Sequence, residues 1–271
     1  MVINKERLAQ TFCEMVSIDS ESYHEKKMKD YLMKVFKECH MECIEMPIEG
    51  FEAGNIYAVL KGDVHKEPIM FSGHMDTVLP GNGRHAIVQE DGRITSDGTT
   101  VLGADDVSAL AAYIEAIRTI QEQSISHGDI ELAISVAEEP YDAGSAYYDF
   151  GRIQSRIGYT FDLAGEVGLA AIEAPSIVSF KIVVEGKSAH AGFNPEDGIH
   201  ALKIASSAII RIPNGHVNDK TTVNFGTIQG GEGRNIVPRE VIITGEIRSF
   251  DHQDALNWSC YIKKIFEEEA A

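Results

Sequence analysis

Four short clusters of histidine and carboxylate residues stand out in this sequence. They occupy residues 72–76 (SGHMD), 103–106 (GADD), 137–140 (AEEP) and 160–162 (TFD). Three of them follow an apolar, strand-like run, and the cluster at 103–106 opens a helix-like run. In an open α/β sheet, groups that follow the carboxyl ends of the strands meet at one edge. One histidine and several carboxylates at one edge predict a site for a hard or borderline divalent cation.

Each cluster also has a more ordinary interpretation. A single histidine is usually a surface residue, and this chain has ten. An Ala-Asp-Asp sequence before a helix is more often a helix cap than a ligand, and Glu138 with Glu139 suits an exposed loop after a strand. The combination is far more specific than its parts, because four separate segments direct polar groups to the same edge.

Composition limits the classes of function that are open to the chain. Its 271 residues are enough for a large core, in one large or two ordinary domains. A formal net charge of −18 argues against nucleic acid, since phosphate binding needs a basic face; solubility explains most of this charge. No apolar run approaches the ~20 residues that span a bilayer. The charged start lacks the apolar core of a signal peptide, and the four cysteines form no CxxC pair or secreted-type framework. We expect a cytoplasmic protein with no membrane partner.

Hydrophobic spacing predicts an α/β fold before residue 175. We expect strands alternating with helices, and therefore a mostly parallel sheet with helices on both faces. The expected helices span residues 6–16, 25–39 and 107–120, with a hairpin tip at 91–93. The expected strands span residues 55–60, 68–72, 130–137, 157–163 and 167–172.

After Pro175 the pattern changes to that of a smaller α+β domain. Strands are expected at 176–184, 221–229 and 240–249, and helices at 198–212 and 256–269. The order β-α-β-β-α predicts a ferredoxin-like layer, which normally has one more strand after its last helix. We therefore expect a chain that is cut short at its C-terminus, with an exposed sheet edge and an apolar patch.

The clusters and their order resemble the co-catalytic di-zinc metallopeptidases, the family of peptidase T, carnosinase-type dipeptidases, aminoacylases and glutamate carboxypeptidases. The segments SGHMDTV, LGADD, AEEPYDAG and FDLAGEVG are most similar to its peptidase T-like branch, and the resemblance covers nearly the whole chain. It implies a metal-binding catalytic domain over residues 1–174 and a lid and dimerisation domain over residues 175–271. It also implies hydrolysis of peptide bonds in short peptides, as by a tripeptide aminopeptidase.

The resemblance further implies which residues bind metal. His74 and Asp162 would bind one Zn²⁺, Asp105 would bridge to a second Zn²⁺, and Glu139 would bind that second ion. A histidine with carboxylates suits zinc, with Co²⁺ or Mn²⁺ as alternatives.

The resemblance also implies roles for two more residues of the first domain, one as a hydrogen-bond acceptor and one as a general base. Asp76 would accept a hydrogen bond from the second nitrogen of His74 and fix its tautomer. Glu138 would be the general base, which takes a proton from a metal-bridging water and returns it to the leaving amine.

The second domain carries its own match, the segment GKSAHAG at residues 186–192. In the family its histidine, here His190, would reach across a homodimer interface to stabilise the oxyanion in the partner's site. A strand end followed by a polar turn is the alternative. Asn224, Asn235 and Arg248 resemble substrate-gripping positions, and an arginine there could hold a peptide carboxylate in a bidentate fork. Asn235 alternatively shapes the turn after the glycine run.

One family element has no counterpart in these residues. In the family the catalytic domain resumes after the lid and supplies a last histidine to the second metal. None of His200, His216 and His252 has a suitable context to replace it, so we expect weak or no activity from residues 1–271 alone. Two other functions stay open: an N-acyl amino acid amidohydrolase with the same metals, and a non-catalytic remnant that serves dimerisation or binding.

Overall fold

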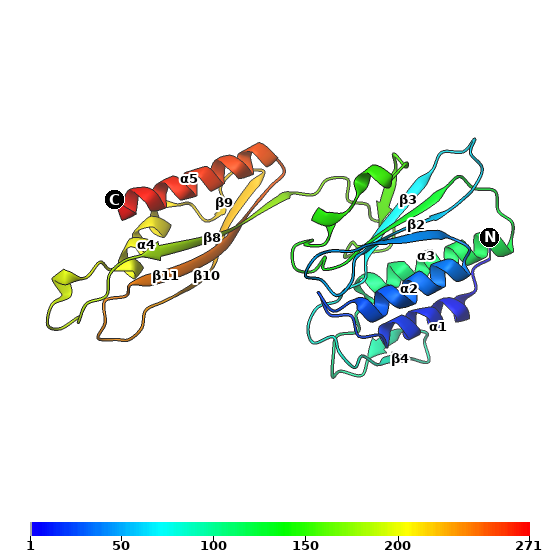
Figure 1. Cartoon of the computed structure of the whole chain (residues 1–271), viewed down its shortest axis with the longest axis horizontal. Helices are drawn as coiled ribbons and strands as arrows, with labels where there is room; N and C mark the ends of the chain where they lie inside the picture. The colour runs from blue at the N-terminus through cyan, green and yellow to red at the C-terminus, as the bar shows by residue number, and fades with distance from the viewer. Residues whose placement is uncertain (1) are drawn as a thin grey trace. The chain divides into compact units, whose positions relative to one another are not determined.

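The chain folds into two compact units, of which the first ends at Val167 and the second comprises Gly168–Ala271. Figure 1 shows their helices and strands in a computed structural model that describes residues 2–271. Each unit has its own hydrophobic core. No helix within these described residues is long and apolar enough to cross a bilayer.

The first unit is built on a five-stranded mixed sheet with the order β1-β2-β6-β3-β7. Strand β3 is parallel to β6 and β7, whereas β2 is antiparallel to β1 and β6. The antiparallel edge follows from the short connection between β1 and β2, which leaves no room for a crossover helix. The strands are β1 (Glu42–Met46), β2 (Asn55–Leu60), β3 (Ile69–His74), β6 (Ile130–Ser135) and β7 (Gly158–Thr160).

Three helices cover one face of this sheet: α1 (Lys5–Val16), α2 (Lys26–Glu38) and α3 (Ala104–Glu122). Their apolar stripes pack against strand residues such as Ile56 and Leu132. The opposite face carries the connection from β6 to β7, with the 3₁₀ helices η1 (Ser145–Tyr147) and η2 (Phe150–Arg152). The fold is therefore α/β as expected, but its sheet is mixed instead of mostly parallel, and its α-helices lie on one face with short 3₁₀ turns on the other.

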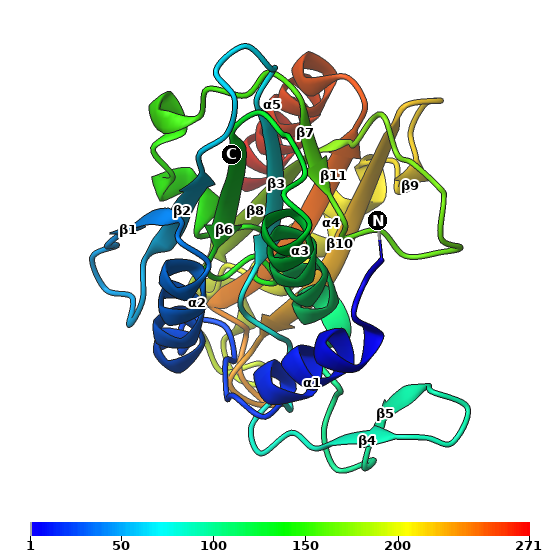
Figure 2. The ribbon, with the colours of Figure 1, turned by 90° about the vertical axis from the view of Figure 1, so that its right-hand side faces the viewer.

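A two-stranded hairpin leaves the first unit between β3 and α3. It consists of β4 (Ala86–Val88) and β5 (Ile94–Ser96), and Figure 2 shows it apart from the main sheet. The expected tip is confirmed, since Gly92 has φ +84° there and the nitrogen of Gln89 donates to the carbonyl of Arg93. Glycine accepts this left-handed backbone without steric cost.

The second unit is an antiparallel sheet of order β8-β11-β10-β9 with α4 and α5 packed on one face. The expected β-α-β-β-α order is confirmed, with the short strand β9 added. The elements are β8 (Ser176–Glu185), α4 (Ala201–Arg211), β9 (Gly215–His216), β10 (Thr221–Gly230), β11 (Glu240–Ser249) and α5 (His252–Ala270).

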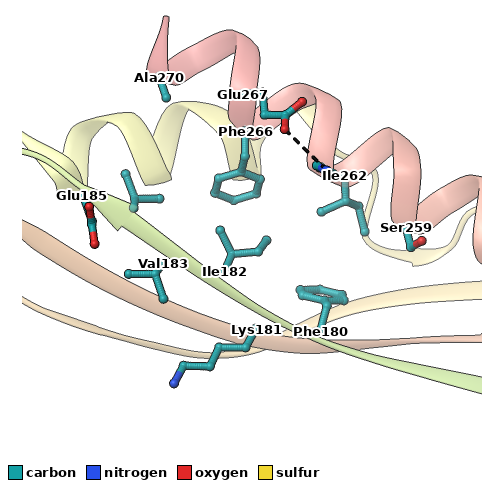
Figure 3. A pocket seen from close by; sticks show the side chains of 12 residues that line it. Phe180, Lys181, Ile182, Val183, Glu185, Ser259, Ile262, Phe266, Glu267 and Ala270 are labelled. Atoms are coloured by element: carbon teal, nitrogen blue, oxygen red, sulfur yellow. Dashed lines mark ion pairs between the residues drawn. The ribbon is translucent and has the colours of Figure 1, made fainter.

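An apolar cavity of about 410 Å³ lies between β8 and α5, as Figure 3 shows. Phe180 and Ile182 line it from the strand, and Ile262 and Phe266 line it from the helix. Strand β8 has β11 as its only neighbour in the described sheet, so its other edge has free backbone groups beside this cavity.

Two strand predictions need correction. The expected strand at 167–172 is absent, because Val167 and Ile172 are almost fully exposed and this stretch pairs with no other strand among residues 2–271. The expected strand at 157–163 is limited to β7, because only three of its residues pair with β3. Apolar composition alone made both stretches resemble buried strands.

Candidate metal centre

The carboxyl ends of β3, β6 and β7 and the start of α3 bring one histidine and four carboxylates together. Ligand atoms of His74, Asp105 and Glu139 all lie within 4.8 Å of one another, and so do those of His74, Glu138 and Asp162. Parallel pairing places His74 opposite Ser135 at the end of β6. Glu138 and Glu139, the acidic pair that follows β6, therefore lie beside the histidine. This is the edge of the sheet that the sequence predicts.

His74 is buried, and its two ring nitrogens face different partners. Nδ1 lies 3.2 Å from Oδ1 of Asp76, and Nε2 lies 3.0 Å from Oδ1 of Asp105. Nε2 is also 3.9 Å from Glu138 and 3.8 Å from Asp162. A proton on Nδ1, donated to Asp76, leaves the lone pair of Nε2 free for a cation among these carboxylates.

Asp76 ties the histidine to the acidic pair. Its buried carboxylate accepts hydrogen bonds from Oγ of Ser22 at 2.8 Å and from the backbone nitrogens of Glu138 and Glu139 at 3.0 and 3.3 Å. Burial by itself would raise the pKa of Asp76, but the hydrogen bonds from His74 and Glu138 lower that pKa. Asp76 therefore stays ionised and fixes the positions of His74, Ser22 and the backbone of Glu138 and Glu139 relative to one another.

The start of α3 presents two consecutive carboxylates in opposite directions. Asp105 is largely exposed toward the cluster, whereas Asp106 is buried and accepts a hydrogen bond from the backbone of His74. Burial raises the pKa of Asp106 to about 8. The sequence interpretation gave Asp106 no role, although its helical spacing from Leu110 and Ile114 indicates an inward-facing position.

The crowded carboxylates favour a bound cation. Burial raises the pKa of Glu138, Glu139 and Asp162, and the charges of neighbouring carboxylates raise it further. Burial lowers the pKa of His74, but the hydrogen bond to Asp76 and its charge outweigh burial and raise that pKa to about 10. A divalent cation removes this repulsion and replaces the protons, so one imidazole and four carboxylates fit such an ion.

A further buried carboxylate, which the sequence interpretation missed, supports the acidic pair from behind. Glu25 accepts hydrogen bonds from the backbone nitrogens of Ala137 and Tyr23, each at 2.9 Å. Ala137 has φ +48°, an uncommon backbone conformation directly before Glu138. No sequence signal marks Glu25, because it precedes α2 like an ordinary helix-capping residue.

Of the four site residues predicted in the second unit, His190 and Asn235 lie in neighbouring turns, and Asn224 and Arg248 lie in the sheet. Nδ1 of His190 accepts hydrogen bonds from the nitrogens of Gly192 and Phe193, and the carbonyl of Asn235 accepts one from Ala191. Asn224 and Arg248 occupy neighbouring strands, on the sheet face away from the helices. Their roles toward substrate remain predictions.

Comparison with known proteins shows similarity to peptidases. The model of peptidase family M28 matches residues 55–168, and that of the peptidase dimerisation domain matches residues 172–271. The structure of aminopeptidase PepT from Bacillus cereus is 40% identical, with a TM-score of 0.89 over 99% of this chain and 73% of that chain. A tripeptidase from Staphylococcus aureus is 35% identical, with a TM-score of 0.92 over 100% of this chain and 73% of that chain.

Curated sequences give the same result. The protein YqjE of Bacillus subtilis is 41% identical over 273 residues, which covers 100% of this chain and 73% of the relative. Peptidase T of Fusobacterium nucleatum is 37% identical over 129 residues, 47% of this chain and 31% of the relative. Because three relatives of 35–41% identity are each covered over 73% of their length, the chain belongs to the peptidase T-like family of M20/M28 metallopeptidases.

Proposed function

We propose that the protein hydrolyses the amino-terminal peptide bond of short peptides, with zinc as its metal. The observation that carries the proposal is the cluster of His74, Asp105, Glu138, Glu139 and Asp162, whose ligand atoms lie within 4.8 Å in two overlapping groups. The names of the similar structures, an aminopeptidase and a tripeptidase, support this choice of substrate.

The same cluster suggests how two cations would be held. His74 and Asp162 would hold one, Glu139 the other, and Asp105, which lies near all three, would be shared between them. Bound divalent cations would supply Lewis acidity, which polarises the scissile carbonyl and makes water more acidic.

Glu138 is the proposed general base. Its carboxylate faces the cluster, 3.9 Å from Nε2 of His74, and burial raises its pKa toward the range useful for proton transfer near neutrality. Its backbone nitrogen is fixed on Asp76, which limits the positions that the side chain can reach. Glu138 would accept a proton from the attacking water and donate it to the leaving amine.

We also propose that residues 175–271 form a homodimer interface, through which His190 serves the partner's site. The match of residues 172–271 to a peptidase dimerisation domain supports this. Asn224, Asn235 and Arg248 would contact the substrate from the same domain.

The test is hydrolysis of a panel of di- and tripeptides and of N-acyl amino acids by metal-stripped protein, before and after addition of Zn²⁺, Co²⁺ or Mn²⁺. We expect metal-dependent release of the amino-terminal residue, with little turnover of N-acyl amino acids. Glu138→Gln should reduce kcat by at least 100-fold while Zn²⁺ still binds in a calorimetric titration.

The matched control is Glu90→Gln, which alters an exposed carboxylate near the hairpin tip of the same unit. It should leave both activity and metal binding unchanged. Metal-dependent turnover of N-acyl amino acids alone would show that the protein is an amidohydrolase instead.

A further inference from the structure

A cavity of about 340 Å³ adjoins the metal centre on the sheet face away from the α-helices. His74, Glu138 and Asp162 form the side of the cavity that belongs to the metal centre. The rest is lined by β3, β6, the end of β7 and the connection that follows Glu139. Its apolar wall consists of Met70, Tyr148, Phe150 and Ile153. A group held at the metal centre therefore has a partly apolar space beside it.

One more carboxylate, that of Asp142, lines this cavity. Asp142 belongs to neither group of possible metal ligands. Its carboxylate makes no hydrogen bond or ion pair with any residue in the described part of the chain. The other carboxylate of this connection outside the metal centre, Asp149, is paired with Arg152 at 3.0 Å. Asp142 thus offers an uncompensated negative charge at the cavity.

The backbone holds Asp142 in place relative to Glu138. Its nitrogen donates to the carbonyl of Glu138 at 2.5 Å. Its own carbonyl accepts hydrogen bonds from the nitrogen and Oγ of Ser145 at 3.2 and 3.0 Å. Tyr141 and Asp142 both have left-handed backbone angles, with φ of +61° and +56°, a conformation that aspartate tolerates better than most residues. The turn that carries Asp142 is therefore fixed at both ends, close to the proposed base.

We propose that this cavity is the subsite for the amino-terminal residue of the peptide, with Asp142 binding its α-ammonium group. The inference rests on the proposed function and names the feature that restricts it to free amino termini. The side chain of that first residue would contact Met70, Tyr148 and Ile153, so the subsite suits an apolar residue.

The charges that line the cavity select a cationic group. No lysine or arginine of the described chain lines it, so beyond the metal centre a substrate carboxylate or phosphate would find no cationic side chain there. Glu138 and Asp162 have their own proposed roles, which leaves Asp142 as the carboxylate available to an ammonium group. A hydrogen bond between two such charged groups is stronger than one between neutral groups.

The test compares Leu-Gly-Gly with N-acetyl-Leu-Gly-Gly on the zinc-loaded protein and on its Asp142→Asn variant. Asparagine keeps the left-handed turn but removes the charge. We expect Asp142→Asn to raise KM for Leu-Gly-Gly about tenfold, with kcat changed less than about twofold, and to leave the acetylated peptide unaffected. The control Asp149→Asn should behave as the unsubstituted protein, because Asp149 lies in the same connection but does not line the cavity.

A second measurement is independent of turnover. Calorimetric binding of the same two peptides to the metal-free protein should show a preference for the free amino terminus that Asp142→Asn abolishes. Equal weakening of both peptides, or no change in either, would overturn the role of Asp142. If the unsubstituted protein cleaves neither peptide, the proposed function fails, and the calorimetric comparison alone decides whether Asp142 binds the ammonium group.

Discussion

The carboxylate of Glu25 accepts a hydrogen bond from the backbone nitrogen of Ala137 at 2.9 Å, although 112 positions separate them. Glu25 is fully buried, and its second oxygen has no partner among the described residues. The contact joins the segment before α2 to the residue that precedes the acidic pair. A single buried side chain thus fixes the backbone position of the residue from which Glu138 and Glu139 follow.

Replacement of Glu25 should therefore affect both stability and metal binding. Glu25→Ala leaves the backbone nitrogens of Tyr23 and Ala137 without their acceptor, and we expect the free energy of unfolding to fall by about 2 kcal/mol or more. Zn²⁺ affinity should fall as well, because the acidic pair loses its support. Glu25→Gln keeps an acceptor oxygen and should cost clearly less in urea unfolding. Equal losses for both variants would show that the charge matters, and not the hydrogen bond to Ala137.

Asp76 offers a sharper test of the metal centre, because it touches the histidine without lying in either group of possible ligands. Asp76→Ala removes the acceptor that fixes the tautomer of His74, so we expect Zn²⁺ affinity to fall about 10- to 100-fold. Calorimetric titration of the metal-stripped protein measures this change. Glu67→Gln, at an exposed position of the same unit, is the control and should bind zinc normally.

The location of the metal centre follows from short-range sequence rules. His74 ends β3, Glu138 follows the adjacent parallel strand β6, and Asp162 follows β7 on the other side of β3. Parallel strands align their carboxyl ends, so the pattern of apolar runs followed by polar residues was enough to predict that these side chains lie close together. The role of Asp105 came from the resemblance to the metallopeptidases, because a carboxylate at a helix start is by itself more often a cap than a ligand.

Features that depend on contacts between residues distant in the sequence could not be predicted from the sequence. Glu25 and Asp142 have no periodic context, and only the folded chain places them beside Ala137 and Glu138. The stretch 167–172 has the composition of a strand, but pairing needs a neighbouring strand with a free edge, which composition does not reveal.

The stability of the protein should depend on pH through Glu131, whose buried carboxylate lies on the sheet face away from the α-helices. It accepts hydrogen bonds from Tyr57 Oη, the backbone of Gln154 and both the backbone and the hydroxyl of Ser155. Burial would raise the pKa of Glu131, but these hydrogen bonds lower it. A carboxyl with a lower pKa in the folded state stabilises the protein above its unfolded pKa of about 4.3 and loses that contribution as the pH falls through the folded value.

We therefore expect Glu131→Gln to be less stable than the unsubstituted protein at pH 7, with the difference shrinking as the pH falls from about 4.5 toward 3. Urea unfolding at several pH values, followed by circular dichroism, measures both free energies. A difference that stays constant over this range would mean that folding does not lower the pKa of Glu131.

Replacement of Gly144 tests whether the connection from β6 to β7, which carries Glu138 and Glu139, is rigidly packed. A Cβ atom at this position would lie 1.9 Å from the carbonyl oxygen of Val136, so the backbone itself must move to accept one. The carbonyl of Gly144 also accepts a hydrogen bond from Asn55 at 2.8 Å, which binds the connection to β2. We expect Gly144→Ala to lower the free energy of unfolding by about 1–3 kcal/mol and to weaken Zn²⁺ binding, because the shift displaces Glu138 and Glu139.

Gly151→Ala is the matched control in the same connection. There a Cβ atom would meet only the side chain of Asp149, at 3.2 Å, and that exposed side chain can rotate away. Urea midpoints and calorimetric zinc titrations of the two variants separate a local steric conflict from a general cost of alanine. If Gly144→Ala unfolds at the same urea concentration as Gly151→Ala and binds zinc equally well, the connection adapts freely. Its packing would then not be what positions the acidic pair.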